Sequence, residues 1–198
     1  MRLPFTRMGA PHPVPRVTPI CAVLYGREED YTLALARLVE RWGEMDLESE
    51  PFAFTATEYY AGEMGPDLKR RFVSFLKPFD PADLADRKLE ANALEVALAE
   101  AIALSDQALG RAPRLRPVNL DPGYLTGAKL VLASTKDFAH RIYLKDGIFA
   151  EVTLRFRGGR WEAHEFTFPD FRAATYHAFL NRMRDKHLRG KHPFPTGC

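Results

Sequence analysis

The pattern of apolar and polar residues near the N-terminus predicts a buried strand followed by an amphipathic helix. Residues 20–25 are uniformly apolar, and the run is too short for a helix. Beyond it, apolar residues recur at the i, i+3, i+4, i+7 spacing that places them on one helical face. This stripe consists of Leu35, Leu38, Val39 and Trp42. Residues 1–18, with prolines at positions 11, 13 and 15, are predicted to form a flexible tail.

The next part of the chain predicts two strands separated by a short helix. The strands are expected at residues 47–54 and 70–77, and the short helix at residues 60–65. Thr55 and Glu58 have the spacing of a capping box, in which the two side chains bond the free amides of a first helical turn.

A long helix is predicted to begin at Asp80 and Pro81 and to end at Gly110. An aspartate side chain accepts hydrogen bonds from the amides of the first helical turn. An amide at the first helical position has no partner within the helix, so proline, which has no amide hydrogen, is well suited to that position. The buried stripe of this helix is predicted to comprise Ala91, Leu94, Leu98, Ala101, Ile102 and Leu109.

The C-terminal half predicts an antiparallel meander that ends in a helix. Lys145-Asp-Gly147 and Gly158-Gly159 interrupt alternating or aromatic-rich runs, as hairpin turns do. Strands are therefore expected at residues 130–134, 140–144, 148–157 and 160–168. Pro169 and Asp170 begin a last helix with the inward stripe Tyr176, Phe179, Leu180 and Met183.

Together these elements predict an α+β domain over residues 19–185, followed by a basic tail at residues 186–198. We expect a mixed, mostly antiparallel sheet with a C-terminal meander. Two longer helices and a C-terminal helix are expected to pack on this sheet.

Pairing about the first hairpin turn assigns the side chains of the meander to two faces. If Leu144 faces Ile148, the apolar residues at 142, 144, 148, 150, 152, 154 and 156 share one face, which we expect to be core. Arg141 then lies opposite Glu151 on the other face. The second hairpin adds two pairs to this face, Arg155 with Glu162 and Thr153 with His164.

The polar face of the meander has two interpretations. In the first it is a solvated surface, on which each exposed ion pair contributes only about 0–1 kcal/mol. In the second it is the floor of a site covered by the segments around Asp121 and Lys136. Tyr143 and Phe149 favour the second interpretation, because they place aromatic surface on a face that would otherwise be wet.

Composition excludes several classes of function. The 198 residues include 28 Lys and Arg against 26 Asp and Glu, and this near-neutral balance gives no long-range field for nucleic acid or anionic membranes. No apolar run approaches the roughly 20 residues that span a bilayer, so no transmembrane helix is expected. With two cysteines, one of them the last residue, we expect no internal disulfide and a cytoplasmic location.

Two short segments carry the candidate chemistry. Asp121-Pro-Gly123 has the composition of a turn, which alone accounts for it, but Asp121 on such a turn is also a candidate base. The segment 136–141 combines Lys136, His140 and Arg141. Such a loop has two interpretations: it carries function, as loops on a rigid scaffold often do, or it is a solvated connection without a role. His140 is a candidate for proton transfer, because histidine is the side chain that most often acts as a general acid or base.

From these residues we predict two sets of site residues. The catalytic candidates are Asp121, His140 and Glu151, and the ligand-binding candidates are Lys129, Lys136, Arg141, Tyr143 and His164. Phosphate and carboxylate groups are the ligands that such cations bind best. No metal site is predicted, because the chain has no His-x-x-x-His motif and no cysteine pair.

The segment of residues 119–144, which opens with Asn119-Leu-Asp-Pro-Gly123, resembles a bacterial family catalogued as domain of unknown function 4416. Residues 59–65, 71–75, 147–154 and 166–171 are similar to that family too, so the resemblance extends over most of residues 20–185. It implies bacterial origin. It implies no activity, substrate, cofactor or catalytic residue.

Two functions from different classes therefore remain. The first is a small-molecule enzyme or binding protein for an anionic ligand that carries phosphate or carboxylate, including nucleotide-like molecules. The second is an RNA- or protein-interaction module without catalysis, which would use the strand that carries Arg70 and Arg71 and the aromatic residues Tyr143 and Phe149. The same aromatic sheet face is also a candidate surface for a homodimer.

Overall fold

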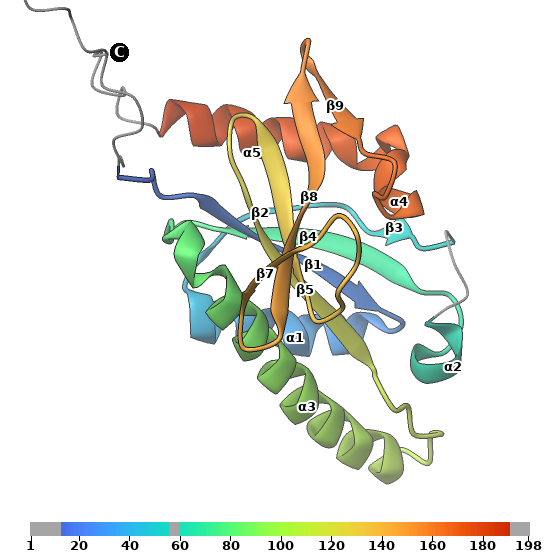
Figure 1. The fold of residues 1–198 in the computed structure, drawn as a ribbon. Coiled ribbons are helices and arrows are strands. Elements are labelled where there is room, and N and C mark those ends of the chain that lie inside the picture. The colour runs from blue at the N-terminus through green and yellow to red at the C-terminus, as the bar shows by residue number, and fades with distance from the viewer. Residues whose placement is uncertain (1–12, 56–59, 191–198) are drawn as a thin grey trace, which may run out of the picture.

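One antiparallel sheet runs through the molecule, with helices on both of its faces (Figure 1). The computed structural model describes residues 13–55 and 60–190. In this part of the chain the sheet has nine strands, and its main path is β2-β4-β1-β5-β6-β8-β7, with β3 paired to β4 and β9 to β8. The strands are β1 Thr18–Tyr25, β2 Met45–Glu48, β3 Phe52–Ala53, β4 Lys69–Phe75, β5 Val118–Leu125, β6 Lys129–Ser134, β7 Ile142–Lys145, β8 Ile148–Arg157 and β9 Arg160–Ala163.

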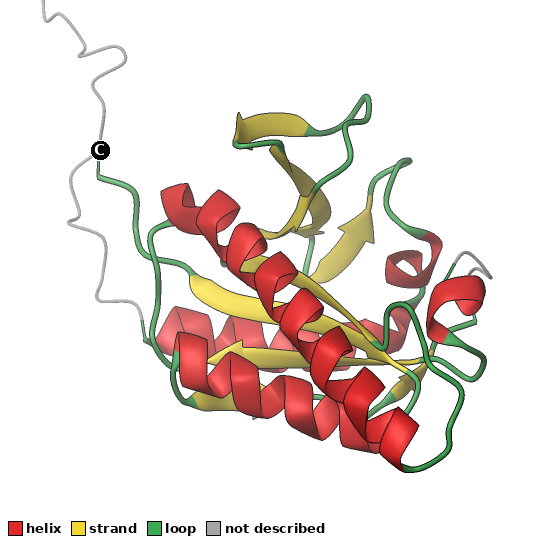
Figure 2. Ribbon diagram, turned by 90° about the horizontal axis from the view of Figure 1, so that it is seen from below, coloured by secondary structure: helices red, strands yellow, loops and turns green. Residues whose placement is uncertain are grey.

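The helices divide between the two faces of the sheet. Two long helices, α1 (Glu28–Trp42) and α3 (Leu84–Ala108), lie across one face, as the view from below shows (Figure 2). The opposite face carries α5 (His177–Arg189) with the short α4 (Pro169–Arg172) before it. A further short helix, α2 (Ala61–Met64), precedes β4. The predicted α+β class, with two longer helices and a C-terminal helix packed on the sheet, is confirmed, and every described strand pairing is antiparallel.

Local chemistry accounts for the turns and the start of the long helix. Asp80 accepts a hydrogen bond from the Ala82 amide at 3.0 Å, and a 3₁₀ turn from Pro81 leads directly into α3. Asp146 and Gly147 both have positive φ angles, 51° and 75°, as a type I′ turn requires. Both hairpin turns lie where the sequence predicts them, and each has two residues between its paired strand ends.

The buried stripe of α3 differs from the predicted one at its C-terminal end. Leu109 is exposed, and Asp106 is buried instead, where it accepts hydrogen bonds from Arg27 at 2.5 Å and Arg114 at 3.2 Å. Ala101 is also exposed. Burial of a charge is costly unless the charge is paired. Asp106 can replace an apolar residue in this stripe because Arg27 and Arg114 pair with it.

The meander contains a β-bulge that changes the predicted faces. Leu130 pairs with Leu154 and Val131 with Val152, so Thr153 is an extra residue in β8. The bulge moves Leu154 and Phe156 to the face on which Glu151 lies, so the prediction that they share a face with Ile148 was wrong. Ile142 and Val152, predicted to be core, are exposed, and the predicted wet residues Glu151 and Thr153 are buried.

The register of the first hairpin is confirmed in part. Ile142 pairs with Ala150 and Tyr143 with Phe149, as predicted, but Ile148 pairs with Lys145 rather than Leu144 because the register shifts after Tyr143. In the second hairpin Arg155 pairs with Glu162.

The ordered elements extend slightly beyond the predicted domain boundaries. Val17 already forms a backbone bridge with Phe79, β1 includes Thr18, and α5 continues to Arg189. The predicted capping box at Glu58 and the outer parts of both predicted tails lie outside the described residues. Within the described residues, no helix combines the length and the apolar character needed to cross a membrane.

Candidate functional site

The sheet splits between β5 and β6, and the candidate site lies over this split. β5 pairs with β1 from Val118 to Leu125, but with β6 only at Gly123, Tyr124 and Leu125. The segment predicted as a turn, 121–123, is therefore part of a strand, and that prediction was wrong. Pro122 is compatible with this strand because β6 does not pair with it and so does not require the amide that proline lacks.

Two side chains of α3 take the place of β6 beside Leu120. The Leu120 amide donates to Oε1 of Glu95 at 2.7 Å, and the Leu120 carbonyl accepts from Nζ of Lys88 at 2.7 Å. Lys88 and Glu95 are seven residues apart and so lie on the same face of the helix. The amide and carbonyl of Leu120, which have no partner on β6, are thereby hydrogen-bonded by side chains from the face of the sheet that α3 covers.

A polar pocket of about 100 Å³ lies over the split. Strand register places Arg70, Asp121 and Glu151 on one face of the sheet, the face that α4 covers. Five cationic side chains and three carboxylates line the pocket, namely Arg70, Lys88, Arg116, Lys136 and Arg141 with Asp121, Glu151 and Asp170. Cationic groups therefore outnumber carboxylates in the lining.

Asp121 is held in its ionised form. Its Oδ1 lies 3.3 Å from Nζ of Lys88, and its Oδ2 accepts from the side-chain Nδ2 of Asn119 at 2.7 Å. Burial by itself would raise the pKa of Asp121, but Lys88, Arg70 and the hydrogen bond from Asn119 outweigh it and lower the pKa below its ordinary value. Asp121 is thus a fixed negative charge rather than a neutral acid.

Glu151 has partners on both of its oxygen atoms. Oε2 accepts from Nε of Arg141 at 2.9 Å and lies 3.0 Å from Nε2 of His140, while Oε1 accepts from the Thr153 hydroxyl at 3.0 Å. Arg141 also donates to the carbonyl of Lys136 at 2.9 Å, which fixes the loop that carries it. The predicted Arg141–Glu151 contact is present, and it lies inside the pocket rather than on an open surface.

Arg70 is buried and incompletely bonded. Its Nη1 donates to Oδ2 of Asp170, which also accepts from the Tyr176 hydroxyl at 3.1 Å. The guanidinium lies over the rings of Phe54 and Phe171, with centroids at 4.8 and 5.2 Å. Among the described residues, no hydrogen-bond partner is found for the buried Nε. A ligand atom that accepts a hydrogen bond would satisfy this buried donor.

Arg116 continues this chain of contacts. It donates to Glu95 at 2.7 and 3.0 Å and to Oδ1 of Asn119, which orients the Asn119 amide group toward Asp121. Burial raises the pKa of Glu95 above its ordinary value, although Lys88 and Arg116 act in the opposite direction. Each carboxylate of the pocket therefore has a cationic partner that it positions, and none is left as an isolated base.

The structure brings some of the predicted site residues together and separates others. Asp121, Glu151, Lys136 and Arg141 line the pocket, and His140 contacts Glu151 beside it. Lys129, Tyr143 and His164 lie outside the pocket lining: Lys129 is exposed opposite Arg155, Tyr143 is exposed on β7, and His164 follows β9. Thr167 rather than the His164 side chain bonds the Thr153 carbonyl.

Sequence reasoning did not identify Arg70, Lys88, Arg116 or Asp170 as site residues, although all four line the pocket. A signal was present for Lys88, because it and Glu95 continue the apolar stripe of Ala91 and Leu98 in α3. Charged residues in such a stripe indicate buried ion pairs or a site. For Arg70 the expected exposed basic strand was wrong, since β4 lies between β1 and β2 and its Arg70 is buried.

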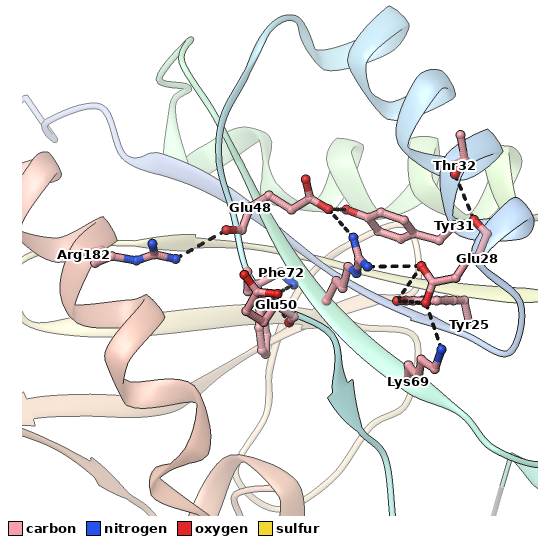
Figure 3. A network of polar contacts seen from close by, with 11 residues as sticks. Tyr25, Glu28, Tyr31, Thr32, Glu48, Glu50, Lys69, Phe72 and Arg182 are labelled. Atoms are coloured by element: carbon pink, nitrogen blue, oxygen red, sulfur yellow. Dashed lines mark hydrogen bonds and ion pairs between the residues drawn. The ribbon is translucent and has the colours of Figure 1, made fainter.

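A second polar network fixes α1 to β2 and β4 (Figure 3). Arg71 donates to Glu48 at 2.7 Å and to Glu28 at 3.1 Å, and the Tyr31 hydroxyl donates to Glu48 at 2.6 Å. Tyr25 donates to Glu28, and burial raises the pKa of Tyr25 to about 12. These contacts join neighbouring elements, and none of these residues lines the pocket over the split, so we assign the network a structural role.

The fold and the site define an α+β protein with a cation-rich pocket over a split antiparallel sheet. Within the described residues, no group of three or more His, Cys, Asp or Glu side chains is arranged to hold a metal ion. The model of the family described as "Domain of unknown function (DUF4416)" matches residues 15–187, and the chain belongs to this family. Neither the curated proteins nor the solved structures contain a significant match.

Proposed function

We propose that the pocket binds a small molecule that carries a phosphate or carboxylate group. The observation that supports this most strongly is the convergence of five cationic side chains from four separate parts of the fold. Two of them, Arg70 and Lys88, are almost completely buried. Both buried cations are paired, Arg70 with Asp170 and Lys88 with Asp121. The buried Nε of Arg70 still lacks a partner among the described residues, and the lining has more cations than carboxylates, so an anionic ligand is favoured.

The residues have distinct proposed roles. Arg141, Lys136 and the Nε of Arg70 contact the anion, because charge-assisted hydrogen bonds from such groups are the strongest available to phosphate or carboxylate. Glu151 positions Arg141 and His140, and Asp121 positions Lys88. His140 is the group best placed to exchange a proton, since it contacts Glu151 at the edge of the pocket.

We propose further that the protein is bacterial and acts in the cytoplasm. Its two cysteines give no sign of a disulfide framework, and Cys21 is a buried free thiol.

Calorimetric titration with inorganic phosphate, oxalate and citrate at low ionic strength tests the function. We expect binding that weakens at least about tenfold in Arg141→Gln, because a charge-assisted hydrogen bond of roughly 1.5–3 kcal/mol is lost. Arg155→Gln is the matched control, since Arg155 forms the equivalent pair with Glu162 on an exposed strand and should bind like the wild type.

Two results would overturn the proposal. One is the absence of binding by all three anions. The other is an equal loss of affinity in Arg141→Gln and Arg155→Gln. The variant Arg141→Lys keeps the charge and guards against misfolding, and its far-ultraviolet circular dichroism should match that of the wild type.

A further inference from the structure

Three exposed phenylalanines lie on two loops beside the pocket. Phe138 belongs to the β6–β7 loop, and Phe166 and Phe168 belong to the loop between β9 and α4. Their exposed fractions are 57% for Phe138 and 43% for each of the other two. Large apolar side chains that are exposed as a group, rather than singly, indicate a binding surface.

The two loops are joined by ring contacts that include His140. The rings of His140 and Phe166 are stacked, with centroids 5.1 Å apart and planes within 5° of parallel. The Phe138 ring forms T-shaped contacts with both, with centroid distances of 5.5 Å to His140 and 6.0 Å to Phe166. We call Phe138, His140, Phe166 and Phe168 the aromatic rim.

The aromatic rim is continuous with the pocket. Phe168 itself lines the pocket, and the Arg141 guanidinium lies 5.7 Å from its ring centroid. His140 shares Oε2 of Glu151 with Arg141, which fixes the imidazole relative to the anion-binding groups. Flat apolar surface and anion-binding groups are thus held next to each other by a single carboxylate.

We propose that the aromatic rim binds the flat ring of a ligand whose anionic group occupies the pocket. The ligand class is therefore an aryl or heteroaryl phosphate or carboxylate, and a nucleoside monophosphate is the simplest widespread example. This inference rests on the proposed function and specifies its ligand. Stacking on aromatic side chains favours any planar ring, and the adjacent Arg141 adds attraction for the anion attached to it.

The placement of the cations favours a small ligand over a nucleic-acid strand. Nonspecific single-strand binding uses a groove of cations that follows many phosphates. Here Arg70 and Lys88 are buried inside one small pocket, and the chain as a whole carries a net charge of only +2. One anion beside one ring matches this distribution of charge.

Affinity measurements with four probes test the inference. The probes are inorganic phosphate, ribose 5-phosphate, phenyl phosphate and adenosine monophosphate, titrated into the full-length protein. We expect phenyl phosphate and adenosine monophosphate to bind at least about tenfold more tightly than ribose 5-phosphate, since they add a ring that can stack. In Phe166→Leu and Phe138→Leu this advantage should fall below about threefold while the affinity for inorganic phosphate stays unchanged.

Tyr143→Leu is the matched control, because Tyr143 is an exposed aromatic residue outside the pocket lining. It should keep the full advantage of the ring-bearing probes. Equal affinity for ribose 5-phosphate and the ring-bearing probes would overturn the aromatic rim as a ring site and leave the proposed anion site standing. Failure of all four probes to bind would overturn both.

Two further measurements would recognise other occupants of the aromatic rim. Decauridylate RNA that binds more tightly than adenosine monophosphate, with affinity that falls steeply with salt, would identify the rim as an RNA surface and overturn the inference. A dimer in sedimentation that dissociates in Phe138→Leu would assign the rim to a second copy of the chain, with the same consequence.

Discussion

Lys88 and Asp121 start on opposite faces of the sheet and meet through its split, with Nζ 3.3 Å from Oδ1. Lys88 belongs to α3, which covers one face with α1, whereas Asp121 faces the pocket on the other. The side chain of Lys88 is 5% exposed and that of Asp121 is 27% exposed. Their contact closes the floor of the pocket.

Replacement of Asp121 by Asn should destabilise the protein by about 3 kcal/mol at pH 7, because it leaves the buried ammonium of Lys88 without its counter-charge. Denaturant unfolding measures this loss. The double variant Lys88→Met with Asp121→Asn should be less destabilised than the sum of the single variants. Strict additivity of the two changes would contradict the interaction.

The same pair predicts a dependence of stability on pH. The pKa of Asp121 is lowered in the folded state, so its contribution is fully present above the ordinary aspartate pKa of about 3.9. That contribution is lost as the pH falls through the lower folded pKa. The difference in unfolding free energy between wild type and Asp121→Asn should therefore shrink between pH 4 and more acidic conditions. A constant difference across that range would show that Asp121 does not titrate as proposed.

Two arginine–glutamate pairs, each with one residue on β8, permit a matched comparison of a buried and a more exposed contact. The side chains of Arg141 and Glu151 are almost completely buried, whereas about half of the Arg155 side chain that pairs with Glu162 is exposed. Glu151→Gln should lower the unfolding free energy by about 3 kcal/mol, because the Arg141 charge stays buried without its partner. Glu162→Gln should leave the unfolding midpoint nearly unchanged. Similar losses in both variants would show that the pocket does not exclude solvent from the first pair.

Gly123 is predicted to be required at the point where β5 and β6 begin to pair. A Cβ atom at this position would lie 2.2 Å from the carbonyl oxygen of Val131 and 2.6 Å from Cδ2 of Leu132. Gly123→Ala should therefore destabilise the protein by about 3 kcal/mol or more in thermal or denaturant unfolding. Gly62→Ala is the control: it has no neighbour within 4 Å and lies in α2, where alanine should stabilise by about 0.5 kcal/mol. A neutral Gly123→Ala would mean that the two strands can separate freely.

The thiol of Cys21 should be unreactive in the folded protein. Burial, and to a smaller extent the charge of Asp121, raises the pKa of Cys21 well above its ordinary value, and the thiolate is the reactive form. In a Cys198→Ser variant, Ellman's reagent at pH 8 should label the single remaining thiol only after denaturant is added. Rapid labelling without denaturant would show that the centre of the sheet opens readily.

The sequence predicts those parts of the site that depend on local pairing. Arg141 and Glu151 flank one hairpin turn, so the turn chemistry at Asp146-Gly147 is enough to bring them together. Arg70 and Asp170 are 100 residues apart and meet only because α4 folds over β4, which no local pattern records. Lys88 is a similar case, since its contact with β5 needs the split in the sheet.

Two local signals had more than one meaning, and the structure decides between them. Asp121-Pro-Gly123 has the composition of a turn but belongs to a strand. Pro122 is compatible with the strand because β6 does not pair with it, and glycine is needed at position 123 because β6 approaches too closely for a Cβ atom. The bulge at Thr153 adds a single residue to β8. One added residue reverses the faces of every later side chain without any change in the alternation of residue types.

The split beside Pro122 also divides the sheet by order of synthesis. The strands on one side, β1 to β5, come from residues 18–125, and those on the other side, β6 to β9, from residues 129–163. A molecule held by both Arg70 of the first group and Arg141 near the second would link them across the gap. Amide hydrogens of β6 and β8 should then exchange more slowly when the pocket is occupied, so that the protein gains rigidity where its own strand pairing stops.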